Sequence, residues 1–118
     1  MATYKETLRS LALSDEDFVA SVLGMGHDTV EVSRLDQKTH ALVRLGAACA
    51  IDAAPSSYQS TVDVALAAGA EMDEIVGTLI AVAPIVGLAR VVAAAPELAL
   101  ALGYDLDAAF EAPRGDDP

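Results

Sequence analysis

The chain has 118 residues, of which 53% are apolar and only 4% aromatic, and its formal net charge is −11. This length suits one domain with its own core, and a composition rich in alanine and leucine favours helices. Nucleic acid is disfavoured as a partner because phosphate backbones repel so acidic a surface. The apolar excess in so small a chain indicates burial against other chains.

Cysteine usage narrows the chemistry further. The single cysteine, Cys49, excludes an intrachain disulfide and a Cys-x-x-Cys pair. With only two histidines besides, no metal site or cofactor is expected. The first ten residues lack the apolar core of a signal peptide, so a cytoplasmic location is expected. Residues 75–95 are long enough to span a bilayer, but Pro84 and Arg90 lie within them and argue against a span.

Apolar spacing along the chain predicts six or seven helices and no strands. Ser14 is expected to cap the start of a helix with an acidic first turn, in which Phe18 and Val22 share one apolar face. Residues 24–35 are predicted to be a connector. His27 in this connector is a candidate general base or metal ligand, although no partner for it is evident.

Two central helices are predicted to form an antiparallel hairpin. The first spans residues 36–51, with Asp36 as its cap. The second spans residues 56–68, after a proline suited to the first helical position, and Gly69 ends it as a C′ residue. We expect this hairpin at the centre of the fold.

A short polar run, residues 55–61, joins the two helices of the hairpin. Helix starts expose N–H groups, so the simplest role of Ser56 and Ser57 is to cap the second helix. The alternative is a small polar pocket lined by Ser57, Gln59 and Thr61, and Tyr58 is expected to be core or pocket wall. Both interpretations stay open at the level of sequence.

The C-terminal third continues as helix. Residues 72–83 carry the most regular apolar face, and Pro84 is expected to break or kink that helix. Helix is predicted to continue over residues 85–95. Pro96 is expected to open another short helix, which Gly103 ends.

The far C-terminus is predicted to be a last turn and a tail. Asp105 is expected to cap a turn that runs through Phe110. The predicted organisation is a single helical domain over residues 1–110 and an acidic, flexible tail over residues 111–118.

About half of the chain, residues 35–91, resembles the carboxymuconolactone decarboxylase and alkylhydroperoxidase D-like superfamily. The run "LDQKTHALVRL" resembles the start of that family's long helix, and "ALAAGAEMDEIVGTLIAVA" resembles its helix, glycine stop, acidic cap and next helix. The spacing between the two runs also fits. The resemblance implies a compact all-helical fold in which trimers, or hexamers built from them, are common.

The redox branch of this superfamily carries Cys-x-x-Cys and a histidine four residues later, with a glutamate on the preceding helix. The resemblance places the two cysteine positions on Ala54 and Ser57, the histidine on Thr61 and the glutamate near Ala41. None of these residues supplies a thiolate or a base. The decarboxylase branch also uses the histidine region, so decarboxylation is in doubt as well.

Three other residues are candidates for a role. Cys49 lies on an apolar helix face, which is typical of a buried core thiol and leaves a one-cysteine redox role as the alternative. His40 is expected on an exposed helix face. Arg90, the lone charge in an apolar segment, is expected to pair with an acid across a subunit boundary, with Asp52 and Asp63 as candidates, or to bind an anionic ligand.

Two functional hypotheses follow. The first is a non-redox homo-oligomer, a trimer or hexamer, that binds a small molecule or supports a partner enzyme. The second is an active lyase, isomerase or peroxidase of the same family. The sequence assigns no catalytic and no metal-binding residue. The possible pocket consists of Ser57, Tyr58, Thr61, His27 and Arg90.

Overall fold

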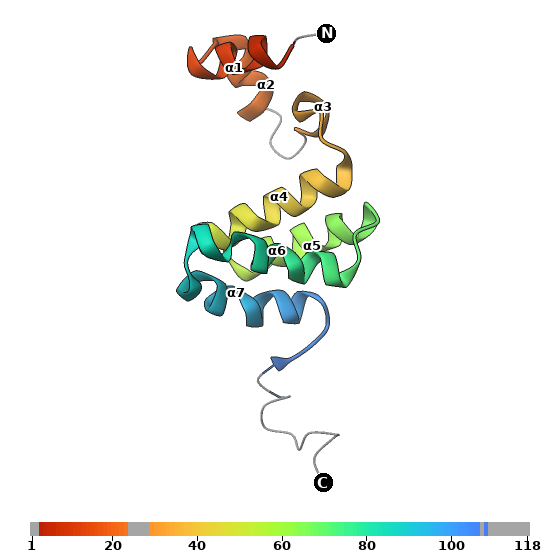
Figure 1. Ribbon diagram of the computed structural model, residues 1–118. Coiled ribbons are helices and arrows are strands. Elements are labelled where there is room, and N and C mark those ends of the chain that lie inside the picture. The colour runs from red at the N-terminus through yellow and green to blue at the C-terminus, as the bar shows by residue number, and fades with distance from the viewer. Residues whose placement is uncertain (1–2, 24–28, 107, 109–118) are drawn as a thin grey trace. The chain divides into compact units, whose positions relative to one another are not determined.

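The computed structural model describes residues 3–23, 29–106 and 108, and no strand occurs among them. The expected all-α class is therefore confirmed (Figure 1). None of the helices in this part of the chain is both long and apolar enough to cross a membrane. The helices are α1 (Tyr4–Ala12), α2 (Glu16–Leu23), α3 (Val30–Ser33), α4 (Gln37–Ala50), α5 (Pro55–Ala67), α6 (Met72–Val86) and α7 (Leu88–Ala101).

Contacts between Cα atoms divide the chain into two compact units, residues 1–36 and residues 37–118. The prediction of a single domain over residues 1–110 stays a prediction. The second unit contains α4 to α7, and with them both helices of the predicted hairpin.

In the first unit, side chains cap both of the longer helices. Thr3 caps α1, because its Oγ1 accepts a hydrogen bond from the N–H of Glu6 at 3.2 Å. Asp15 caps α2, because its Oδ1 accepts one from the N–H of Phe18 at 3.1 Å. The prediction that Ser14 is this cap was wrong. Ser14 instead adopts a left-handed φ of 51° as the chain leaves α1.

The predicted connector, residues 24–35, contains a short helix in its second half. This helix, α3, ends at Arg34, whose φ of 61° is left-handed. A connector without any helix was therefore the wrong expectation for this segment. His27 lies outside the described residues.

The second unit forms its core where α4 and α7 both contact α5 and α6 (Figure 1). α4 begins one residue after Asp36, and α5 begins at Pro55, so the predicted hairpin is confirmed. Alanine and medium-sized aliphatic residues dominate this core, which lets the helices approach closely. The buried apolar residues are Ala41, Leu45, Ala48, Cys49, Tyr58, Val62, Ala65, Ala70, Ile75, Leu79, Ala94 and Leu98.

The start of α5 is held without a side-chain cap. Pro55 takes the first helical position, as predicted, and Ala54 is the N-cap residue. The predicted capping role of Ser56 and Ser57 was wrong, because a capping hydroxyl has to stand before the first turn and these two stand within it. The backbone closes the turn instead: the N–H of Ser57 donates to the carbonyl of Ala54 at 2.9 Å.

Glycine ends two of the helices, as predicted. Gly69 follows α5 with a φ of 95°, and the N–H of Ala70 donates to the carbonyl of Ala65 at 2.9 Å. This is the Schellman arrangement, which satisfies carbonyls that the helix end leaves open. Gly103 follows α7 with a φ of 87° and the same arrangement.

The last described turn begins at Asp105, as predicted. Its Oδ1 accepts a hydrogen bond from the N–H of Ala108 at 3.1 Å. The predicted end of this turn at Phe110 lies outside the described residues, as does the predicted tail over residues 111–118.

The two internal prolines do not end helices. α6 continues past Pro84 to Val86, and Gly87, with a φ of 99°, separates it from α7. Pro96 lies inside α7 and was wrongly predicted to open a helix. A proline removes one backbone hydrogen bond from a helix, and this loss is tolerated where tertiary packing holds the helix in place.

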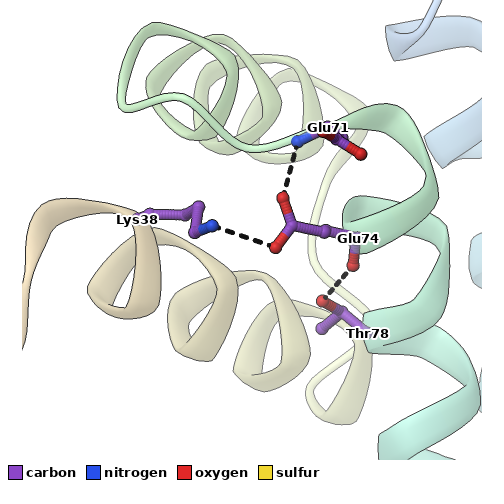
Figure 2. Close-up of polar contacts among 4 residues, drawn as sticks. All are labelled: Lys38, Glu71, Glu74 and Thr78. Carbon is purple, nitrogen blue, oxygen red and sulfur yellow. Dashed lines mark hydrogen bonds and ion pairs between the residues drawn. The ribbon is translucent and has the colours of Figure 1, made fainter.

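A polar network fixes the start of α6 beside α4 (Figure 2). Glu71 and Glu74 form a capping box in which the N–H of Glu71 donates to Glu74 Oε1 at 2.9 Å. The other carboxylate oxygen of Glu74 lies 3.1 Å from Lys38 Nζ on α4. The hydroxyl of Thr78 donates to the Glu74 carbonyl at 3.0 Å. The first turns of α4 and α6 are thus tied together.

Farther along, α4 and α6 come into close contact at Gly46. A Cβ added to Gly46 would lie 3.0 Å from Val82 Cγ1 and 3.6 Å from Thr78 Cγ2. Because the first turns of the two helices also meet, α4 and α6 run in the same direction. Only a residue without a side chain leaves Val82 undisturbed at this crossing.

Two glycine-to-alanine variants test this close approach. Gly77 lies in α6, and a Cβ there would meet nothing within 4 Å. Gly77→Ala should therefore stabilise the fold by about 0.5–1 kcal/mol, the usual entropic gain in a helix. Gly46→Ala should be at least about 1 kcal/mol less stable than Gly77→Ala, because it overpacks the crossing. Urea unfolding measures both, and equal stabilisation would show that the crossing has room to spare.

The Glu74 network predicts a pH-dependent contribution to stability. The N–H of Glu71 and the side chain of Lys38 lower the pKa of Glu74. Its stabilisation is therefore present above the carboxyl's ordinary pKa of about 4.3 and is lost as pH falls through the lower pKa of the folded state. The melting temperature of the wild type should exceed that of Glu74→Gln at pH 7, and this difference should shrink below about pH 4.

The matched control for that experiment is Asp73→Asn. Asp73 is an exposed acid in the same first turn of α6, so it feels the same helix dipole. A difference that is equally large at pH 7 and pH 3, or that Asp73→Asn reproduces, would contradict the role given to the Glu74 network.

Candidate functional site

The end of α4, the start of α5 and α7 surround the region where the resemblance places the family's active site. Tyr58, on the first turns of α5, is fully buried in the core. Its hydroxyl donates to the carbonyl of Ala48 at 3.4 Å, and burial raises the pKa of Tyr58 above its ordinary value. The predicted alternatives were core or pocket wall, and within the chain Tyr58 is core.

Cys49 follows Ala48 on α4 and has no exposed surface. Burial raises the pKa of the Cys49 thiol, the charge of Arg90 opposes this effect, and Asp52 adds to it. The thiol is therefore protonated near neutral pH. Because the thiolate is the reactive form, Cys49 behaves as a small hydrophobic core residue, as expected from its helix face.

Arg90 lies near Asp52, one of the two acids predicted as its partner. The distance from Arg90 Nη1 to Asp52 Oδ2, in the turn that links α4 to α5, is 3.8 Å. Asp63, the other predicted candidate, accepts a hydrogen bond from Gln59 Nε2 at 2.9 Å instead. Within one chain the side chains of Arg90 and Asp52 are 49% and 64% exposed, so the pair is a surface ion pair. Such pairs contribute little to stability.

The positions of the family's cysteine pair are accessible but carry no reactive group. Ala54 and Ser57 are exposed, one helical turn apart at the start of α5. Thr61, at the histidine position, donates its hydroxyl to the carbonyl of Ser57 at 2.8 Å. Ala41, near the glutamate position, is buried in the core. Ser57 and Thr61 are therefore neighbours in the structure, but neither residue supplies a thiol or a base.

His40 was wrongly predicted to be exposed: only 7% of its surface is accessible. Its neighbours at helical spacing, Gln37, Arg44 and Ala47, are exposed, so His40 is buried on a side of α4 that is otherwise accessible. Among the described residues, no three His, Cys, Asp or Glu side chains gather closely enough to hold a metal ion.

An apolar groove of about 510 Å³ between α4 and α6 was not found by sequence reasoning. None of Ser57, Tyr58, Thr61 and Arg90 lines it. Each helix carries a stripe of small and aliphatic residues at helical spacing, which can be seen in the sequence. The groove itself can be recognised only when it is known that the two helices lie side by side. This α4/α6 groove is lined by Thr39, Leu42, Val43, Gly46, Ala47, Ala50, Thr78, Ala81, Val82, Ile85 and Val86.

These features define an all-helical domain that keeps a helical hairpin with an accessible second-helix start and a buried thiol. The carboxymuconolactone decarboxylase family matches residues 16–100, which is most of the chain. The protein belongs to this family. No curated protein and no solved structure matches the chain.

The burial of Cys49 predicts a thiol that does not react in the native protein. A soluble aromatic disulfide reagent should label Cys49 at least about 100-fold more slowly than the thiol of an Ala54→Cys variant, because Cys49 reacts only after local opening. Ala54 is exposed, so it is the matched control. Both thiols should react at once in denaturant. A native Cys49 that reacts as fast as the control would contradict its place in the core.

Proposed function

We propose that this protein is a non-redox, homo-oligomeric member of the family that acts by binding a small anionic molecule. The observation that carries the proposal is that no accessible thiol stands at the expected site. Cys49 is buried, and Ala54 and Ser57 occupy the positions where the resemblance places the family's two cysteines. A binding role is the first of the two hypotheses, and support of a partner enzyme is compatible with it.

The non-redox part rests on what disulfide chemistry requires. A peroxidase cycle needs an accessible thiolate and a second thiol to resolve the oxidised form. Ser57 is exposed but its hydroxyl is not a redox group, and Thr61 is no acid or base near neutral pH. Cys49 is the only thiol of the chain, so it has no intramolecular partner.

The homo-oligomer is supported by α6. No charged residue occurs between Ile75 and Ala89, and Thr78 is the one polar side chain of α6 from Ile75 to its end at Val86. Helices of this kind are surrounded by protein. Within one chain, however, Ile80 is 70% and Ile85 is 90% exposed. A trimer or hexamer, the assemblies that the family resemblance implies, would cover these side chains.

The anionic ligand is supported by Arg90. It is the single basic residue between Arg44 and Arg114. Its guanidinium is half exposed and only loosely paired with Asp52 at 3.8 Å, so donors remain for a carboxylate or phosphate. Asp52 sits at the turn before α5, next to the place where the family has its active site.

Small carboxylates test the binding role. We expect at least one of three carboxylates to raise the melting temperature of the wild type when added singly at millimolar concentration: acetate, succinate or benzoate. A ligand that binds the folded state stabilises that state against unfolding. Arg90→Met keeps most of the side-chain volume and should abolish the rise. Arg9→Met, a charge change on an exposed residue of α1, is the matched control and should keep it.

Two results would overturn the proposal. A thermal response that Arg90→Met retains would remove the binding site from Arg90. Turnover of an alkyl hydroperoxide in the presence of a dithiol that disappears in Cys49→Ser would establish the competing peroxidase function.

A further inference from the structure

The α4/α6 groove has the shape that a helix requires. Its lining residues on α4 follow a spacing of three and four, from Thr39 through Val43 and Gly46 to Ala50. Those on α6, from Thr78 to Val86, follow the same spacing. Two parallel helices that each present such a stripe form a seam into which a third helix packs with its own apolar face.

The lining of the groove does not suit a small polar ligand. Small-molecule sites combine apolar walls with a few polar groups that orient the ligand. Here Thr39 and Thr78 are the only polar side chains in the lining, and the hydroxyl of Thr78 already donates to the carbonyl of Glu74. Val43 and Ile85 remain 57% and 90% exposed, so what covers them has to extend over the edge of the groove.

The charge of the chain restricts the surface through which a second copy can dock. Two molecules that each carry a net charge of −11 repel one another, so they can associate closely only through a face without carboxylates. The chain has 18 acidic residues, yet none of them lines the α4/α6 groove. The centres of protein interfaces are similarly depleted of charge.

The accessible apolar surface of the groove is only part of what an interface needs. Three of the five larger aliphatic residues of the lining are already partly packed against the core, and only Val43 and Ile85 are largely exposed. A stable interface buries about 800 Å² on each partner. The groove can therefore be the centre of an interface only if apolar residues outside its lining, such as the 70% exposed Ile80, are covered with it.

We propose that the α4/α6 groove is a self-association face of this protein, covered by a helix of a second copy of the chain. The inference rests on the proposed homo-oligomer and assigns that assembly a specific surface. The place where the resemblance puts the active site, at the start of α5, stays outside the groove, since neither Ser57 nor Thr61 lines it.

Light scattering on the full chain tests the surface. Ile85→Glu places a carboxylate in the groove and should weaken self-association at least tenfold, so that the measured mass falls toward the 12.1 kDa of one chain. Val64→Glu is the matched control, because Val64 is 56% exposed on α5 and outside the groove. Circular dichroism should show both variants folded.

Thiol labelling locates the covered face independently of any loss of folding. In the assembled protein, the cysteine of Ile85→Cys should react at least tenfold more slowly than that of Val64→Cys, and the buried Cys49 adds little background. Dilution to the single chain should remove the protection. Protection that persists in the single chain would mean that something other than a second copy covers the groove, and the inference would be wrong.

The outcomes separate this inference from the function it rests on. A wild type that is monomeric at micromolar concentration would overturn the homo-oligomer and the self-association face together. A wild-type oligomer in which Ile85→Cys labels as fast as Val64→Cys, or in which Ile85→Glu keeps the wild-type mass, would overturn the face alone.

Discussion

The crossing of α4 and α6 at Gly46 is the contact on which the second unit depends. With 3.0 Å between Val82 Cγ1 and the place of a Cβ on Gly46, the crossing leaves no free space for a side chain at that position. The same approach brings Lys38 within 3.1 Å of Glu74, so an ion pair and a capping box hold the first turns together (Figure 2). The α4/α6 groove follows from this crossing, because the stripes on both helices then face the same side.

The start of α5, where the resemblance places the family's active site, is accessible but carries no thiol and no base. Tyr58 anchors this helix in the core through the carbonyl of Ala48, and Pro55 sets its first turn. The chain still presents two exposed residues one turn apart there, but they are Ala54 and Ser57. The one thiol, Cys49, lies buried in the neighbouring helix, where desolvation keeps it protonated. The exposed Arg90–Asp52 ion pair lies at the adjacent turn.

Local sequence predicted those features that local sterics decide. Gly69 and Gly103 end helices because they adopt a φ near 90°, which other residues rarely do, and Pro55 is pre-shaped for a first turn. Pro96 was misjudged because a proline's local cost can be outweighed by packing along the rest of the helix, and α6 likewise runs two residues past Pro84 before Gly87 separates it from α7.

The remaining errors arose where the local sequence does not decide the outcome. His40 was placed on an exposed face, and its neighbours on that face, Arg44 and Ala47, are exposed, but His40 itself is buried, which the helical period of α4 does not predict. The sequence limited the predicted partner of Arg90 to Asp52 or Asp63. The structure was needed to show that Asp52, in the turn before α5, is the acid that lies near Arg90. The α4/α6 groove could not be predicted from the sequence, because it is formed by two helices that are separated in sequence by the whole of α5.

The central claim is that the exposed apolar surface of α6 is covered when copies of the chain associate. Backbone hydrogen exchange of the segment 72–86, compared above and below the concentration at which the chain assembles, tests this claim most directly. The account predicts that exchange in this segment is slowed at least tenfold in the assembled protein, while that of the exposed helix α1 is unchanged. Equal exchange of the segment 72–86 in the assembled and dilute protein would contradict the account.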